Sequence, residues 1–278
     1  MMEVVRTVAE MRERVAGWRH TGERISLVPT MGALHEGHMS LVRQGDELSD
    51  RSVVSIFVNP TQFAPHEDFT TYPRDESRDL AMLEKADVDL VFAPDVTQMY
   101  RDDHRTKVEV QGLSQILEGQ FRPQFFIGVA TVCAKLLIQT MPDVAIFGEK
   151  DYQQLCVIRA MARDLDLPVQ IIGGDTIRES DGLAMSSRNT YLSNTERTLA
   201  PYLHQEITGV ARRVKSGDAI EVACADATQQ LDAAGFKSVD YVAVRDAETL
   251  EMPAQGRPMR VLAAAWLGKT RLIDNVAV

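Results

Sequence analysis

The feature of this sequence that most constrains its fold is an alternation, over residues 1–175, of short apolar runs with longer amphipathic segments. The runs are rich in β-branched residues and short enough for buried strands, whereas the segments between them repeat apolar residues at helical spacing. We predict strands at residues 25–30, 52–58, 88–92, 143–147 and 169–172, and helices at 37–48, 77–85, 129–139 and 152–164. This order indicates βαβ units, and therefore an α/β fold built on a parallel sheet with helices on both faces.

The pattern changes after residue 175. Two helical segments, at residues 194–215 and 218–233, precede three strand-like runs at 238–244, 259–267 and 271–276. Consecutive strands joined by short turn-rich segments are typical of an antiparallel sheet. We therefore predict two domains: an α/β domain over residues 1–175 and a smaller C-terminal α+β domain over residues 176–278.

Charge and composition restrict the class of partner. The net charge is −10, so we expect no nucleic-acid partner, because a nucleic-acid surface needs clustered basic residues. No apolar stretch approaches the length of a membrane span, so we expect no membrane partner either. The three cysteines, Cys133, Cys156 and Cys224, are widely separated. They indicate reduced thiols in a cytoplasmic protein.

A pair of histidines follows the first predicted strand. His35 and His38 lie in the string Pro-Thr-Met-Gly-Ala-Leu-His-Glu-Gly-His, where a strand ends and a helix begins. The first turn of a helix presents free backbone N–H groups and a positive dipole end, which favour phosphate. Residues three apart lie on one helix face, so both imidazoles can reach one phosphate chain. The alternative is an ordinary loop with two polar residues.

Two polar clusters follow the second predicted strand. Asn59 and Gln62 offer uncharged amide groups suited to the hydroxyls or carboxylate of a small polar substrate. Asp79, at the start of the next helix, is a candidate ligand for a Mg²⁺ ion that accompanies a nucleotide, since Mg²⁺ is bound by carboxylate and phosphate oxygens. A solvated acidic helix start is the alternative for Asp79.

Two further clusters carry cationic side chains. After the fourth predicted strand, Lys150 can place a charge on phosphate, with Asp151 suited to ribose hydroxyls and Gln154 on the first helical turn. At the domain junction, the run Ser186–Arg188 can grip phosphate oxygens, and its loop can close over a bound nucleotide. No serine or cysteine nucleophile motif and no Walker A sequence occurs, so we expect catalysis by positioning and charge stabilisation.

Several of these strings resemble a known family. His-Glu-Gly-His at 35–38 resembles the HIGH signature of the nucleotidyltransferase superfamily, and Met-Ser-Ser-Arg at 185–188 resembles its KMSKS counterpart. The strings at 29–38, 57–63, 147–155 and 178–189, in this order and spacing, are similar to the pantoate–β-alanine ligase family along nearly the whole chain.

The resemblance implies a two-step reaction. The pantoate carboxylate attacks the α-phosphorus of ATP, giving pantoyl adenylate and pyrophosphate, and the β-alanine amine then displaces AMP. It also implies a cytoplasmic homodimer with Mg²⁺-dependent activity in coenzyme A biosynthesis. Each chain would consist of a Rossmann-like domain at 1–175 that binds nucleotide and pantoate and a C-terminal lid domain at 176–278.

The resemblance further implies roles for individual residues. His38, Lys150 and Arg188 match catalytic positions, and Gln62, Gln154 and the neighbouring Asn59 match the pantoate site. The ATP site is matched by Met31, His35, His38, Gly148, Lys150, Asp151, Ile177, Met185, Ser186, Ser187 and Arg188.

One position departs from the family pattern. Where the family usually reads Arg-Pro-Gly-His-Phe, this chain reads Arg-Pro-Gln-Phe-Phe, so that Phe125 replaces a histidine. Phenylalanine cannot donate a hydrogen bond to an anion, and we predict weaker binding of an anionic substrate with the fold intact. The alternatives to the ligase are another nucleotidylyltransferase of the superfamily and a catalytically weakened nucleotide-binding homologue.

Overall fold

The computed structural model describes residues 2–64 and 67–278 and divides the chain into two compact units. Unit 1 comprises Met1–Glu149 and Val157–Asp175. Unit 2 comprises Thr176–Val278 together with the short segment Lys150–Cys156. We describe each unit by itself.

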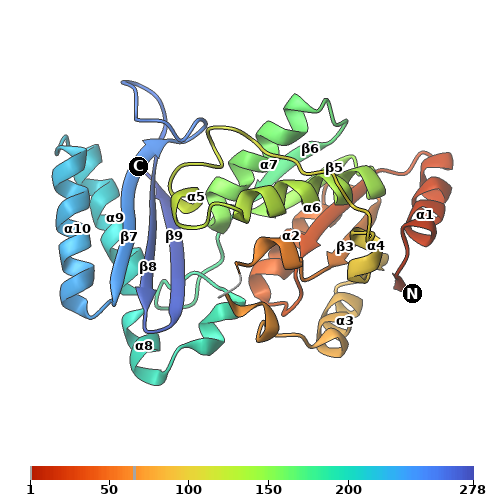
Figure 1. The fold of residues 1–278 in the computed structure, drawn as a ribbon, viewed down its shortest axis with the longest axis horizontal. Coiled ribbons are helices and arrows are strands. Elements are labelled where there is room, and N and C mark those ends of the chain that lie inside the picture. The colour runs from red at the N-terminus through yellow and green to blue at the C-terminus, as the bar shows by residue number, and fades with distance from the viewer. Residues whose placement is uncertain (1, 65–66) are drawn as a thin grey trace. The chain divides into compact units, whose positions relative to one another are not determined.

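Unit 1 is built on a six-stranded parallel sheet with the strand order β1-β4-β3-β2-β5-β6 (Figure 1). Its strands are β1 (Glu3–Val5), β2 (Ile25–Thr30), β3 (Arg51–Ile56), β4 (Leu90–Phe92), β5 (Val144–Gly148) and β6 (Gln170–Gly174). The predicted α/β class is therefore confirmed, and the five strands that the sequence predicts all form. Because all strands are parallel, their carboxyl ends share one sheet edge, where ligands of such sheets bind.

The helices of this part of the chain are α1 (Val8–His20), α2 (Glu36–Asp46), α3 (Glu76–Lys85), α4 (Val96–Met99), α5 (Glu118–Phe121), α6 (Phe125–Thr140) and α7 (Tyr152–Asp164). Side chains alternate between the faces of a strand, so Val28 and Val54 pack under α2 and α3 on one face. There they bury Leu41, Val42 and Leu83. Burial of each such side chain contributes about 1.5–3 kcal/mol to folding.

The N-terminal elements β1 and α1 are not among the predicted ones. Only Met11 and Val15 are buried in α1, so its apolar periodicity is weak. A local signal does mark its start: the Thr7 side chain accepts a hydrogen bond from the Glu10 N–H, and Glu10 bonds back to the Thr7 backbone. This capping box defines the helix more clearly than its hydrophobic pattern does.

Unit 2 contains an antiparallel sheet of β7 (Ser238–Asp246), β8 (Met259–Leu267) and β9 (Thr270–Ala277). Helices α9 (Tyr202–Lys215) and α10 (Ile220–Ala234) pack on one face of it (Figure 1). The single helix predicted at 194–215 is wrong. It is divided into α8 (Asn194–Leu199) and α9, because Pro201 has no N–H to continue the hydrogen-bond ladder.

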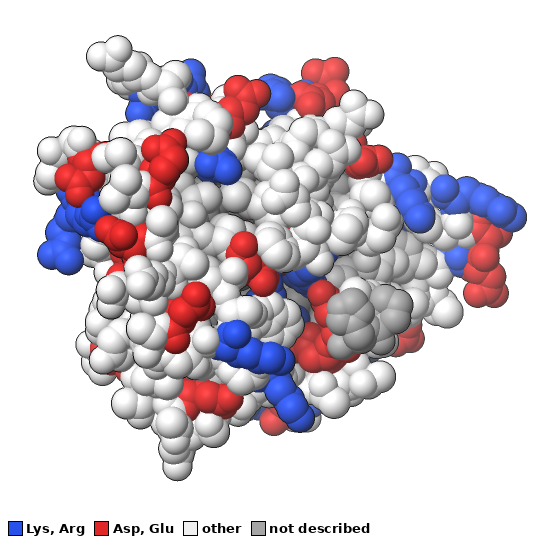
Figure 2. All heavy atoms as spheres, turned by 60° about the vertical axis from the view of Figure 1, so that its left-hand side comes forward, with Lys and Arg blue, Asp and Glu red and all other residues white. Residues whose placement is uncertain are grey.

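Acidic and basic side chains are interspersed on the face of the molecule that Figure 2 shows. Among the residues that the structure describes, no helix is both long and apolar enough to cross a membrane.

Candidate functional site

The histidine pair of unit 1 lies where the sequence places it, between β2 and α2. His35 is the N-cap of α2, and its Nδ1 accepts a hydrogen bond from the Gly37 N–H at 3.2 Å. His38 Nδ1 accepts from the His35 N–H at 3.3 Å, and the two ring centroids are 4.1 Å apart. Because Nδ1 is an acceptor in both rings, each neutral imidazole carries its proton on Nε2. Both side chains are therefore donors through Nε2.

A buried carboxylate holds the loop that precedes this pair. Asp79, on the first turn of α3, accepts hydrogen bonds from the N–H groups of Ala33 and Leu34, both at 2.8 Å. Ala33 and Gly32 have positive φ angles of 50° and 78°, and a Cβ at Gly32 would lie 3.0 Å from Asp79 Oδ2. Burial raises the pKa of Asp79, and the two backbone hydrogen bonds oppose that shift.

This geometry gives Asp79 a structural role in the histidine loop, and the metal-ligand role that the sequence indicates stays a prediction. Both of its carboxylate oxygens are bonded to the backbone, one to each N–H group. Within residues 2–64 and 67–278, no cluster of three His, Cys, Asp or Glu side chains is arranged to hold a metal ion. Asp79 therefore positions the loop that precedes the histidines.

Asn59 follows β3 and is completely buried. Its Nδ2 donates to the Gly128 carbonyl at 3.2 Å and to Gln62 Oε1 at 2.9 Å. Its Oδ1 accepts from the Thr61 N–H and from the Tyr100 hydroxyl. Both donor hydrogens of Asn59 are therefore used within the protein, and the direct pantoate contact expected from the sequence stays a prediction.

The orientation of Gln62 follows from these contacts. A backbone carbonyl and a backbone N–H identify the two ends of the Asn59 amide without ambiguity. Since Asn59 Nδ2 donates to Gln62 Oε1, the Nε2 of Gln62 is the end left to donate to a ligand. Helix α6 lies close to the 3₁₀ turn Pro60–Gln62. The contact requires glycine in α6, because a Cβ at Gly128 would lie 2.3 Å from the Thr61 carbonyl oxygen.

Phe125 begins α6 and packs on Arg122. The Arg122 guanidinium carbon lies 3.7 Å from the Phe125 ring centroid, a cation–π contact. Arg122 also forms ion pairs with Glu67 and Glu118 and donates to the Gln62 carbonyl at 3.1 Å. The residue that departs from the family pattern thus contacts the arginine that holds the Gln62 backbone.

In unit 2, Lys150 lies in a single 3₁₀ turn, Glu149–Asp151, directly before α7. Its ammonium is 3.9 Å from the Asp151 carboxylate, and its carbonyl accepts a hydrogen bond from Asn275 Nδ2 at 3.0 Å. The side chain of Gln154 is half-buried and has no hydrogen-bond partner in the described part of the chain. Lys150 and Gln154 are thus presented one helical turn apart on a short anchored segment.

The predicted run Ser186–Arg188 lies in a loop that backbone hydrogen bonds hold in place. Arg178 and Ala184 form an isolated antiparallel bridge, and the Met185 N–H donates to the Ile177 carbonyl at 2.9 Å. Ser186 caps the 3₁₀ turn Ser187–Tyr191 by accepting from the Arg188 N–H. The remaining predicted ATP-site residues, Met31 and Gly148 in unit 1, lie just beyond β2 and at the last position of β5.

Ion pairs fix the base of this loop. Arg178 donates to both oxygens of Asp274, at 2.7 and 2.9 Å, and Arg197 donates to Asp181 and Glu179 at 2.6 and 2.8 Å. Arg178, Glu179 and Asp181 belong to the predicted string at 178–189, whereas Arg197 and Asp274, like Tyr100, Arg122 and Asn275, are not among the predicted site residues. Asp274 and Asn275 are distant in sequence from the segments that they contact, so only the tertiary structure brings them together.

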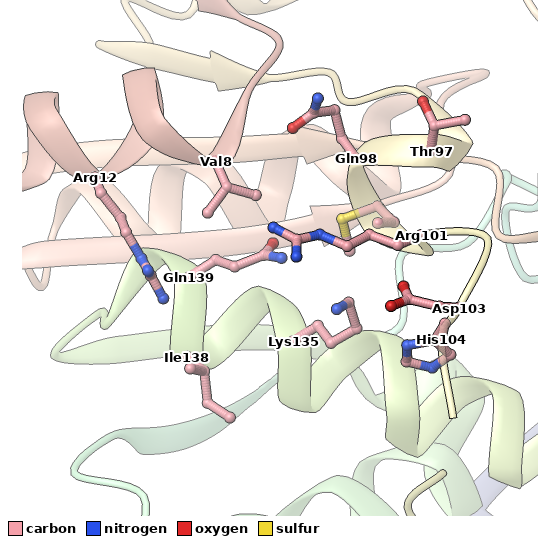
Figure 3. Close-up of a pocket in the computed structure, with 11 residues that line it drawn as sticks. Val8, Arg12, Thr97, Gln98, Arg101, Asp103, His104, Lys135, Ile138 and Gln139 are labelled. Atoms are coloured by element: carbon pink, nitrogen blue, oxygen red, sulfur yellow. The ribbon is translucent and has the colours of Figure 1, made fainter. Parts of the chain in front are cut away.

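A cavity of about 550 Å³ lies among α1, α4 and α6 (Figure 3). Arg12, Arg101 and Lys135 line it together with Gln98 and Gln139. Burial and the charge of Arg101 lower the pKa of Lys135. None of its described lining residues belongs to the predicted ATP or pantoate sites, so this cavity is separate from the motifs.

Comparison with known proteins agrees with these motifs over the whole chain. The family model described as pantoate-beta-alanine ligase matches residues 3–277. The pantothenate synthetase of Paramagnetospirillum magneticum is 56% identical over 279 residues, covering 100% of this chain and 98% of that protein. The pantothenate synthetase of Caulobacter vibrioides is also 56% identical, covering 99% and 98%.

Solved structures agree in fold as well. The pantoate-beta-alanine ligase of Thermus thermophilus has a TM-score of 0.93 at 44% identity, with 99% of each chain covered. The ligase of Francisella tularensis complexed with beta-gamma ATP and beta-alanine has a TM-score of 0.85 at 32% identity, covering 100% of this chain and 98% of that one.

Proposed function

Because the chain belongs to the pantoate–β-alanine ligase family, it is an ATP-dependent enzyme that condenses pantoate with β-alanine, and we propose how its residues divide this work. The match to this family over nearly every residue decides between the ligase and another nucleotidylyltransferase. The proposed route has two steps: pantoate is first activated as an acyl adenylate with release of pyrophosphate, and β-alanine then displaces AMP.

The orientation of the two histidines is the observation that carries the phosphate-binding part of the proposal. His35 and His38 both accept backbone N–H groups at Nδ1, so that Nε2–H can donate to phosphate oxygens while the rings are neutral. Such donors stabilise the charge that develops on the α-phosphoryl group and on the departing pyrophosphate. Their action requires no covalent intermediate with the enzyme.

The other proposed contacts follow the predicted motifs. Lys150, Ser186, Ser187 and Arg188 bind phosphate oxygens, and the proposed catalytic residues are Lys150, Arg188 and His38. Met31, Gly148, Asp151, Ile177 and Met185 contact the adenosine part of ATP. Gln62 and Gln154 bind pantoate through their side-chain amides, and Asn59 orients Gln62 without contacting the substrate itself.

Mg²⁺ is proposed to arrive with ATP, held by phosphate oxygens and water, because both Asp79 carboxylate oxygens already accept backbone hydrogen bonds. When bound, the ion would neutralise phosphate charge. A homodimer, a cytoplasmic location and a lid role for the C-terminal domain at 176–278 remain proposals drawn from the family resemblance. The nucleotide- and pantoate-binding role of the domain at 1–175 is of the same kind.

The experiment that tests this function is a product assay with all three substrates. AMP, pyrophosphate and pantothenate should form in equal amounts, and only when ATP, pantoate and β-alanine are all present. Release of ADP, or turnover without pantoate, would contradict the proposed route. Binding of ATP without any product would instead support a catalytically weakened homologue.

A further inference from the structure

Two consecutive residues of β9, Asp274 and Asn275, contact both phosphate-binding segments of unit 2. We propose that they are positioning residues that hold Lys150 and the loop 178–189 in the arrangement that ATP requires. This inference rests on the proposed ATP contacts of Lys150 and Arg188. Both residues are about 95% buried and lie far in sequence from the segments that they hold.

Asn275 holds the Lys150 segment through one oriented amide. Its Nδ2 donates to the Lys150 carbonyl at 3.0 Å, and its Oδ1 accepts from Arg260 Nη1 at 2.5 Å. An arginine can only donate, so this contact identifies which end of the amide faces Lys150. The Arg260 guanidinium in turn lies 3.7 Å from the Tyr152 ring centroid, on the first turn of α7. The turn that carries Lys150 is thus fixed from two sides.

Asp274 holds the other segment through charge. Its two oxygens receive a bidentate pair from Arg178, which also donates to the Gly182 carbonyl inside the loop at 3.1 Å. His204 Nδ1 lies 3.5 Å from Asp274 Oδ2. Burial alone would raise the pKa of Asp274, but the contacts with His204 and Arg178 outweigh it and hold the pKa below its usual value. The carboxylate is therefore ionised at neutral pH, as a guanidinium partner requires.

One strand links these two contacts. Side chains of consecutive strand residues leave on opposite faces, so Asp274 and Asn275 reach separate partners from one rigid element. Arg178 also donates to the Asn275 carbonyl at 3.3 Å, and the Asn275 N–H donates to Asp274 Oδ1 at 2.7 Å. A shift of either phosphate-binding segment would therefore break a hydrogen bond to β9. Catalysis by positioning is sensitive to such shifts.

The test replaces each residue and measures pantoate-dependent pyrophosphate–ATP exchange together with the unfolding temperature. For Asn275→Asp and Asp274→Asn, we expect the KM for ATP to rise about tenfold, with the KM for pantoate changed less than about twofold. The matched control is Asp240→Asn. It removes another partly buried carboxylate, paired with Arg271 at 2.7 Å between β7 and β9, without touching either segment. It should lower the unfolding temperature and leave both KM values unchanged.

A double-variant cycle separates positioning from general stability. In a Lys150→Ala background, Asn275→Asp should have less than half of its effect on the KM for ATP, because the side chain that it positions is absent. An equal effect in both backgrounds, or an unchanged KM for ATP in both single variants, would overturn the inference. If the unsubstituted enzyme shows no pantoate-dependent exchange, the proposed function fails instead, so the two failures are distinguishable.

Discussion

The two groups of phosphate-binding residues are held in place by different kinds of interaction. In unit 1, the loop before His35 and His38 is fixed through its backbone, by a buried Asp79 that accepts two N–H groups. In unit 2, the loop before Arg188 is fixed through side-chain ion pairs, of which Arg178–Asp274 is the most buried. Loss of the backbone contacts of Asp79 should therefore disable the histidine loop. The loop before Arg188 should instead depend on the charge of its ion pairs, and therefore on pH.

The largest effect is expected from Asp79→Ala. This change leaves two N–H groups beside α3 without their acceptor, at a cost of roughly 1–3 kcal/mol each. Release of the histidine loop should lower exchange activity about a hundredfold, since small displacements of catalytic groups cost that much. Urea unfolding and pyrophosphate–ATP exchange measure the two effects.

The control is Asp89→Ala. Asp89 also accepts a backbone N–H, from Ser52, and pairs with Arg51 at the start of β3, at the opposite ends of the strands. The Asp89→Ala change should reduce stability, and the exchange activity of the folded variant should stay within about twofold of the parent. Similar losses of activity in both variants would show that the Asp79 contacts have no special role.

The second largest effect is expected at the proposed pantoate-binding residues of unit 1. Asn59→Ala removes the donor that orients Gln62, so the KM for pantoate should rise about tenfold while the KM for ATP stays nearly constant. Tyr100→Phe is the matched control, because it removes a donor to Asn59 Oδ1 and leaves the Nδ2 contact with Gln62 intact. If both variants raise the KM for pantoate equally, the orienting role of Asn59 is wrong.

The third prediction uses pH to separate the two units. The pKa of Asp274 is held below the usual 3.8, so its ion pair contributes stability above that value, and this contribution is lost as the pH falls through the lowered pKa. The difference in unfolding temperature between the parent and Asp274→Asn should therefore shrink as the pH is lowered from 7 to below 3.8. A difference that is constant or grows over this range would contradict it.

The contribution of Asp79 to stability depends on pH in the opposite direction. Burial raises its pKa, so its contribution is present below 3.8 and is lost as the pH rises through the raised pKa. As the pH falls, Asp79 is therefore protonated before Asp274, and the Arg178–Asp274 pair keeps its charge to lower pH.

The smallest effect is expected from Phe125→His. The change restores a donor that can titrate, and should lower the KM for an anionic substrate several-fold, which corresponds to about 1 kcal/mol. The unfolding temperature measures the accompanying loss of the ring that packs on Arg122. If kcat and KM are both unchanged, the side chain at position 125 does not contact the substrate.

The elements and motifs could be predicted because their signals are local. Strand periodicity placed β2 and β5, and the motifs after them, within two residues of their observed positions. The roles of Asp79 and Asn59 could not be predicted, because they depend on partners such as Leu34 and Tyr100 that only the folded chain brings near. Helix α1 was missed because its apolar pattern is weak, whereas the break at Pro201 could have been read from the proline alone.

The most direct test of the central claim is the exchange of labelled pyrophosphate into ATP without β-alanine, which isolates the first step. We expect exchange to require pantoate and to fall by at least about a hundredfold in Lys150→Ala, with the protein still folded. Exchange that proceeds without pantoate, or that Lys150→Ala leaves unchanged, would contradict it.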